Sequence, residues 1–232
     1  MNILKKIQLP TGILTWITLI AGVWLVFNVP DDFQQGGAVK ILYIHVPSAK
    51  MALLSYLVVT VASILHLWKR SETADILAEA ATSVGAAFTA MTLASGSIWG
   101  KPMWGTWWAW DARLTSMLVL LILFKGLMVL RHSLDDPVKG ARATAILAII
   151  GAVDLPIIHY SVVWWRTLHQ PPSLSAGSNA GIHIAGPLLT PLLILTVAFM
   201  LLTLYMTTVK ARQIEARRRL DALETARMHA DE

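Results

Sequence analysis

The chain of 232 residues contains no cysteine. It can therefore form no disulfide bond, carry no thiol redox couple and attach no prosthetic group through the thioether bonds of a CxxCH motif. Charged residues are also scarce, at 14% against 56% hydrophobic residues, and the mean hydropathy is +0.60. A soluble domain of this length needs far fewer apolar residues, so the composition indicates a membrane protein.

The basic balance of the chain fits this environment. A net charge of +5 and a pI near 9.6 could suit a nucleic-acid partner, but the Lys and Arg residues fall in short clusters between apolar runs. Such clusters are typical of segments at a membrane surface. The first apolar run follows Lys5 and Lys6 and has no small-residue cleavage site before Asp31, which predicts a retained signal anchor.

Six apolar runs are long enough to cross roughly 30 Å of hydrocarbon as helices. The sequence therefore predicts an all-α membrane protein, a bundle of six transmembrane helices. No pair of matching Gly- or Pro-broken spans appears in the two halves, which argues against an alternating-access transporter. The predicted spans are 12–30, 46–68, 76–98, 114–131, 143–161 and 186–208.

The distribution of positive charge predicts the orientation. Thirteen Lys and Arg residues lie on the side of the termini and the even-numbered connections, five lie on the other side, and Lys125 lies within a span. By the positive-inside rule both termini are cytoplasmic and the odd-numbered connections face the periplasm of a bacterial inner membrane. We expect residues 1–210 to form the membrane domain and residues 211–232 a charged, helical cytoplasmic tail.

The third connection is unusually rich in tryptophan. Five of the ten tryptophans lie between Trp99 and Trp110. If residues 104–111 form a short helix along the membrane surface, three indoles and Asp111 share one face. An aromatic belt is the alternative, but a belt spreads its aromatics over many helix ends. We therefore favour a platform for a flat, apolar ligand. Its predicted tryptophans are Trp104, Trp107, Trp108 and Trp110.

Three charged residues border this segment. Asp111 directly precedes the fourth span and is well placed to cap it, with or without a ligand contact. Lys101 and Arg113 are positive charges on the side where such charges are rare. They are candidates to pair with a ligand carboxylate, and snorkelling to lipid phosphates is the alternative for each.

Two histidines are predicted at the depth of the tryptophan platform. His45 precedes Pro47, a natural first-turn residue for the second span, and His169 follows the fifth span. Haem iron accepts two axial imidazoles on opposite faces, so the pair predicts a haem site beside the indoles. His159 is a candidate packing or supporting residue, and Asp154 is an acidic group inside a predicted span. We expect less of His66 and His132, which could pair or face headgroups, and of His183, a weaker ligand candidate.

Five segments of the sequence resemble known protein families. WGTWWAWD, at Trp104 to Asp111, resembles the tryptophan-rich "WWD" signature of haem-handling membrane proteins. The flanking GSIWGKP and DARLT, the segment YIHVPSA at 43–49 and the segment LPIIHYSVVWWRTLHQ at 155–170 are similar to the cytochrome c maturation protein C family, also called haem exporter protein C. The motifs occur in order through all six spans. Larger WWD proteins carry additional spans and an external domain, which are absent here.

The resemblance implies a function. A family member would present non-covalent, b-type haem transiently on its periplasmic face, with His45 and His169 as the axial ligands and the WWD segment around the ring. It would pass the haem to a periplasmic chaperone of the cytochrome c maturation protein E type, which binds it covalently through a histidine. The implied partners also include ATP-binding cassette subunits of the A and B types, whose ATP hydrolysis releases the loaded chaperone, and a small single-span subunit of the D type.

The residues leave two other functions open. A b-type electron-transfer subunit would also use paired histidines, although such ligands normally project from span interiors. A permease subunit for another amphipathic solute would use neither histidine. No independent catalytic site is identifiable, so we expect a haem delivery protein and not an enzyme in its own right.

Overall fold

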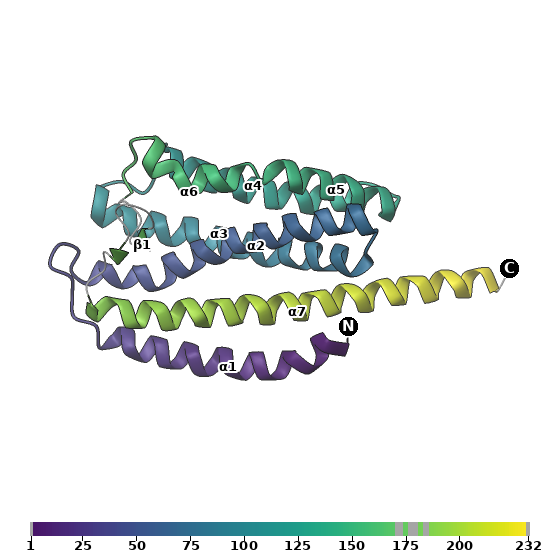
Figure 1. The fold of residues 1–232 in the computed structure, drawn as a ribbon, viewed down its shortest axis with the longest axis horizontal. Coiled ribbons are helices and arrows are strands. Elements are labelled where there is room, and N and C mark those ends of the chain that lie inside the picture. Colours follow the sequence, from purple (N-terminus) through teal and green to yellow (C-terminus); the bar gives the residue numbers. More distant parts are fainter. Residues whose placement is uncertain (1, 170–173, 176–180, 183–185, 231–232) are drawn as a thin grey trace.

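The computed structural model describes residues 2–169, 174–175, 181–182 and 186–230, whose helices run roughly side by side in one elongated bundle (Figure 1). Within these residues there are seven α-helices, one short 3-10 helix and one pair of antiparallel two-residue strands. In chain order they are α1 (Asn2–Phe27), η1 (Gly37–Ile41), α2 (Leu42–Lys69), α3 (Glu72–Trp104), α4 (Ala112–His132), α5 (Pro137–Gly151), α6 (Asp154–Trp164), β1 (Leu174–Ser175), β2 (Gly181–Ile182) and α7 (Gly186–Ala230).

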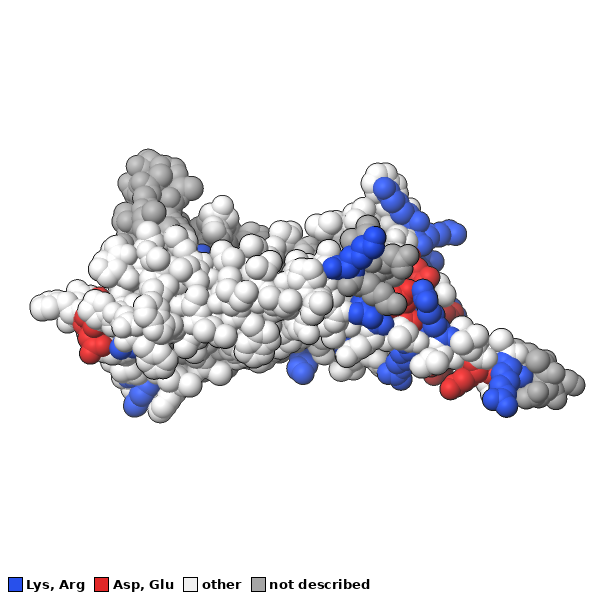
Figure 2. Space-filling model, turned by 90° about the horizontal axis from the view of Figure 1, so that it is seen from below, with Lys and Arg blue, Asp and Glu red and all other residues white. Residues whose placement is uncertain are grey.

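Six segments are long and apolar enough to cross a membrane, which confirms the predicted six-span helical protein. Side chains on α1 such as Ile17 and Ile20 are more than half exposed, as lipid-facing residues should be. In the face drawn in Figure 2, charged side chains are sparse along the middle of the bundle and gather toward the end with the α7 extension. This pattern is that of a multi-pass membrane protein.

The α2–α3 hairpin forms the middle of the bundle (Figure 1). Helices α4, α5 and α6 pack on one side of it, α7 packs on the other, and α1 packs mainly along α7. The bundle therefore has two ends. We call one the tryptophan end, which holds Trp99, Trp104 and residues 105–111, and the other the terminal end, which holds the start of α1 and the extension of α7.

The fifth span is two helices and not the single one predicted. α5 ends at Gly151, and Ala152 and Val153 form tight turns to carbonyls three residues earlier, at 3.2 and 3.3 Å, before α6 begins at Asp154. The buried Tyr56 hydroxyl of α2 lies against this break, where a Cβ on Gly151 would be 2.1 Å from its oxygen. The close approach of Tyr56 therefore requires glycine at position 151.

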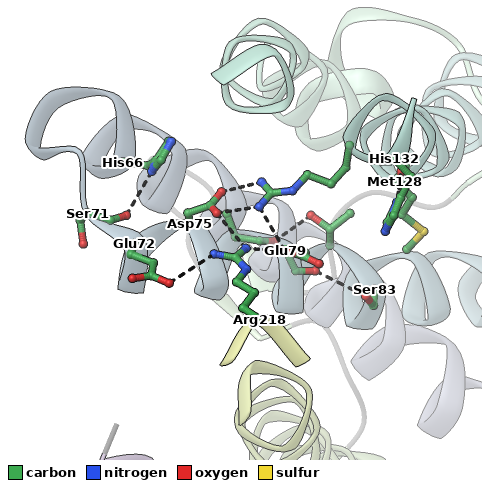
Figure 3. A network of polar contacts seen from close by, with 12 residues as sticks. His66, Ser71, Glu72, Asp75, Glu79, Ser83, Met128, His132 and Arg218 are labelled. Atoms are coloured by element: carbon green, nitrogen blue, oxygen red, sulfur yellow. Dashed lines mark hydrogen bonds and ion pairs between the residues drawn. The ribbon is translucent and has the colours of Figure 1, made fainter. Parts of the chain in front are cut away.

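An ion-pair network joins three helices at the terminal end (Figure 3). Arg131 of α4 donates two hydrogen bonds to the buried Asp75 carboxylate of α3, both at 2.6 Å. Arg218 of α7 donates to Asp75 at 2.8 Å and to Glu79 at 2.7 Å. A bidentate pair with a second arginine satisfies both buried carboxylate oxygens, so the network fixes α7 against α3 and α4.

The network also explains the course of α7 beyond the bilayer. The helix is continuous through residues 210–211, the predicted boundary of the tail, and Ala211 and Ile214 are buried against Ile76 and Ala80 of α3. Beyond the network, Leu220 and Leu223 are exposed, and Figure 1 shows this part of α7 projecting alone. The tail thus has a packed first section and a solvated second one.

Candidate functional site

The structure brings the predicted site residues to one end of the bundle. The start of α2, the end of α3, the start of α4 and the chain after α6 all meet at the tryptophan end (Figure 1). The nine residues there are His45, Lys101, Trp104, Trp107, Trp108, Trp110, Asp111, Arg113 and His169.

His45 lies in the first turn of α2, because this helix begins at Leu42 and not at the predicted 46. Pro47 is consequently in the second turn, one step deeper than predicted. The His45 Nδ1 is 3.1 Å from the Ser95 hydroxyl oxygen of α3, and its ring meets Trp99 edge-on with centroids 5.7 Å apart. Trp99 is itself held, since its Nε1 donates to the Gln35 side chain at 3.0 Å.

His169 lies after α6 and packs against the other indole at the end of α3. Its ring centroid is 4.9 Å from that of Trp104. Its Nδ1 is 3.7 Å from Asp111 Oδ2, which is an ion-pair distance and too long for a hydrogen bond. Burial lowers the pKa of His169, and the charge of Arg113 adds to this effect while that of Asp111 opposes it. The imidazole is therefore neutral near pH 7 and has a lone pair for a metal.

Asp111 connects the tryptophan segment to the His169 segment. Its Oδ1 accepts the Leu114 N–H at 2.8 Å, which confirms the predicted cap of α4. Its Oδ2 accepts the Leu168 N–H at 3.1 Å, a contact that the sequence did not reveal. With only 8% of its side chain exposed, this one carboxylate fixes two segments that are 57 residues apart.

The short helix predicted for residues 104–111 is wrong. α3 continues through Trp104 and ends at Gly105, whose φ of +76° is a left-handed conformation that glycine adopts without strain. The following residues form no regular secondary structure and are held by hydroxyls. Thr106 Oγ1 donates to the Trp108 carbonyl at 2.8 Å, and Ser97 Oγ donates to the Trp107 carbonyl at 2.6 Å. The indoles therefore do not share one helical face.

The tryptophans of this segment fall into two groups. Trp107 and Trp110 are 56% and 76% exposed, whereas Trp104 and Trp108 are partly buried. The Trp108 Nε1 and the His169 Nδ1 are buried and have no hydrogen-bond partner among the described residues. Buried polar atoms are normally satisfied, so the Trp108 Nε1 donor fits a site that receives a ligand with acceptor groups, while the His169 Nδ1 faces Asp111. Apolar indoles can stack on a porphyrin ring and neutral imidazoles can bind its iron, so these residues suit an iron porphyrin.

Arg113 and Lys101 differ in how many hydrogen bonds they already make within the protein. Arg113 donates to Ser161 Oγ at 3.1 Å and to the carbonyls of Ile158 and His159 at 3.2 Å each, so most of its guanidinium binds the end of α6. Lys101 is exposed and donates to the Gly105 carbonyl at 3.0 Å. Lys101 is thus the more available of the two for a ligand carboxylate.

The remaining histidines lie apart from this arrangement. His159 is exposed, and its ring meets that of the neighbouring Tyr160 edge-on at 4.7 Å, so its predicted packing or supporting role stays a prediction. At the terminal end, His66 Nδ1 is 3.1 Å from the Ser71 carbonyl and His132 Nδ1 is 2.8 Å from the Met128 carbonyl, so neither interacts with the other (Figure 3). His183 lies outside the described residues.

Asp154, the acidic residue predicted inside the fifth span, is buried at the first position of α6. Its Oδ2 has no hydrogen-bond partner in the part of the chain that the structure describes. It lies at the break between α5 and α6, and no hydrogen bond among the described residues assigns it a role.

Comparison with known proteins identifies the family of the chain. The sequence profile of the family described as "Heme exporter protein C" matches residues 1–226. This chain belongs to that family. It is 43% identical over 229 residues to the heme exporter protein C of Bradyrhizobium diazoefficiens, covering 96% of this chain and 86% of that protein. It is 47% identical over 154 residues to that of Escherichia coli K12, covering 66% of this chain and 63% of that protein.

The family reaches beyond bacteria. The chain is 38% identical over 207 residues to a mitochondrial protein of Marchantia polymorpha whose name assigns it to cytochrome c biosynthesis, covering 89% of this chain and 87% of that protein. The chain is therefore a multi-pass membrane protein of a haem exporter family, involved in haem handling for cytochrome c biogenesis.

Proposed function

We propose that this protein binds haem at the tryptophan end and delivers it to a haem chaperone during c-type cytochrome biogenesis. One observation carries the proposal. His45 and His169 come from segments more than 120 residues apart, yet each packs against an indole of the same last turns of α3. Each also turns its Nδ1 toward a protein oxygen, which leaves Nε2 as the natural iron ligand.

The other residues of the site have separate tasks in this proposal. The exposed faces of Trp107 and Trp110 offer stacking area to one face or edge of the porphyrin. The Trp108 Nε1 donor and the Lys101 ammonium are available to its propionates. Arg113 and Asp111 act mainly by holding the end of α6 and the His169 segment in place. The chain has no cysteine, so no thioether bond can hold the haem, and binding in this proposal is non-covalent.

We place the tryptophan end on the periplasmic side of the bacterial inner membrane. The excess of Lys and Arg at the terminal end supports this orientation, which makes both termini cytoplasmic. A chaperone that takes haem from this end would then approach from the periplasm. Subunits of an ATP-binding cassette module and a small single-span subunit are the further partners that we propose for this protein.

Release is the main difficulty for such a site. Two imidazoles from one protein would hold haem tightly and slow its transfer. We propose that the tight site is complete only while the chaperone is bound. Purified protein should therefore lose haem faster alone than in the presence of the chaperone. Equal retention in the two states would contradict this part of the proposal.

The decisive experiment replaces the two histidines. His45→Ala and His169→Ala, singly and together, should each lower haem retention and chaperone loading. His132→Ala is the matched control, because this exposed histidine lies at the opposite end of the bundle. Wild-type haem retention and loading in the double variant would overturn the proposal. Reversible redox cycling of firmly held haem would favour an electron-transfer subunit, and no Soret band under haem-replete expression would favour a permease for another solute.

A further inference from the structure

α3 presents a socket for the His45 ring, formed by Ser95 and Gly96. Ser95 is buried on α3, and its Oγ lies 3.1 Å from His45 Nδ1. Gly96 is the next residue along the same helix. Neither residue belongs to the tryptophan-rich segment, and both come from the spanning part of α3.

The hydrogen bonds of Ser95 determine which histidine nitrogen carries the proton. A serine hydroxyl has one hydrogen to donate and two lone pairs to accept with. Ser95 Oγ lies 2.7 Å from the Met91 carbonyl, which can only accept, and 3.2 Å from that of Thr92. With its hydrogen used within the helix, Ser95 meets His45 as an acceptor, so the proton resides on Nδ1. The lone pair of the neutral imidazole is then on Nε2.

Gly96 determines how close the ring lies to α3. A Cβ at this position would be 2.9 Å from His45 Cε1 and 3.4 Å from Nδ1. The first distance is shorter than a normal carbon–carbon contact, so any side chain here would displace the imidazole. Trp99 borders the same ring from one turn further along α3, edge-on at 5.7 Å. The ring is thus enclosed by one helix face, and its rotation is restricted.

We infer that Ser95 and Gly96 are positioning residues that fix the tautomer and the placement of His45, so that Nε2 faces the haem iron. The inference rests on the proposed function, in which His45 is an axial ligand. Partners of this kind orient a ligating imidazole and raise its basicity, and their loss typically weakens metal binding by about 10- to 100-fold. The sequence did not reveal the socket, because residues 45 and 95 become neighbours only when α2 packs on α3.

The test uses the full-length protein, purified, reconstituted with haemin and measured with the chaperone present, because the proposed tight site is complete only in that state. Ser95→Ala should release haem to apomyoglobin about tenfold faster than wild type and lose part of the six-coordinate, low-spin spectrum. Ser95→Thr keeps the hydroxyl and should restore both properties. Ser83→Ala is the matched control, since Ser83 makes the same bond to the carbonyl four residues earlier on α3, at 3.4 Å, but lies near the terminal end. Gly96→Ala should impair the spectrum at least as much as Ser95→Ala.

His45→Ala, measured in parallel, separates the two levels of the argument. If it loses the low-spin spectrum while Ser95→Ala and Gly96→Ala keep wild-type spectra and release rates, the socket is overturned and the ligand assignment survives. If His45→Ala itself behaves as wild type, the ligand assignment and the socket both fail. An equal effect of Ser95→Ala and Ser95→Thr would also overturn the tautomer argument. Thermal unfolding of each variant without haem shows whether its fold is intact.

Discussion

The Asp111 carboxylate performs two functions, one with each oxygen, and a conservative substitution can separate them. In Asp111→Asn, the remaining side-chain oxygen can still cap α4 at Leu114, because asparagine is a good capping residue. The new amide group cannot accept from Leu168 and has no charge beside His169. We expect stability within about 0.5 kcal/mol of wild type, but haem affinity lower by about tenfold.

Asp111→Ala provides the comparison for this prediction. It removes the cap as well and should cost about 1 kcal/mol of stability in addition to the loss of affinity. Haem titration and thermal unfolding of the two variants measure both quantities. If the two variants bind haem as wild type does, Asp111 is a cap alone. If Asp111→Asn and Asp111→Ala lower the stability equally, Asp111 does not stabilise the protein by capping α4.

Residues that act through local structure were predictable from the sequence. The cap at Asp111 followed from its place before an apolar run, whereas the platform, expected from the density of tryptophan between Trp99 and Trp110, stays a prediction. The partners Ser95 and Gln35 were not predictable, because their contacts with the site depend on which faces of distant segments meet. Serine and glutamine are common in such segments, so nothing in the sequence distinguishes these two.

At the scale of helices, the break between α5 and α6 depends on the contact of Gly151 with Tyr56. Gly151→Ala would place a methyl group 2.1 Å from the Tyr56 hydroxyl oxygen and about 3.1 Å from Leu123. We expect this overlap to lower the free energy of unfolding by about 1–3 kcal/mol. The higher helix propensity of alanine should offset about 1 kcal/mol of that loss. Tyr56→Phe removes the oxygen, which has no hydrogen-bond partner among the described residues, and should be nearly neutral.

The double variant tests the contact itself. Gly151→Ala combined with Tyr56→Phe should be more stable than the sum of the single effects predicts, because the obstructing atom is gone. Denaturation of the four proteins in one detergent gives the coupling energy. Additive effects would show that the hydroxyl does not limit position 151. Ser133→Ala, at an exposed position after α4, provides a variant that should leave stability unchanged.

The number of spans was predictable and their internal features were not. Apolar runs set the six spans, because only a helix satisfies its own backbone in lipid. The run 143–161 is apolar through Ala152 and Val153, so hydropathy alone does not reveal the break there. The helix expected at 104–111 failed because α3 extends through Trp104, and the left-handed Gly105 then ends it.

At the scale of the whole molecule, the bundle separates the tryptophan end, where we propose that haem binds, from the charged terminal end. The contacts of α7 cover the full length of the bundle, from Leu188 beside Tyr43 to Arg218 beside Asp75. α7 is therefore the element that links the two ends. The stability of the bundle should therefore depend on the packed section of α7, residues 211–219, and not on the projecting section, residues 220–230.

Two truncations of different length test this division. Removal of residues 220–232 deletes only the projecting part of α7, so the thermal midpoint in detergent should stay at the wild-type value. Removal of residues 211–232 deletes the buried Ile214 and the Arg218 ion pair, leaving Asp75 with Arg131 alone. Loss of two buried apolar residues, Ala211 and Ile214, and of one partner of a buried carboxylate should lower stability by about 3–5 kcal/mol. Equal stability of the two truncated proteins would mean that residues 211–219 do not hold α7 in place, and a loss in the shorter deletion would mean that the projecting helix packs on the bundle.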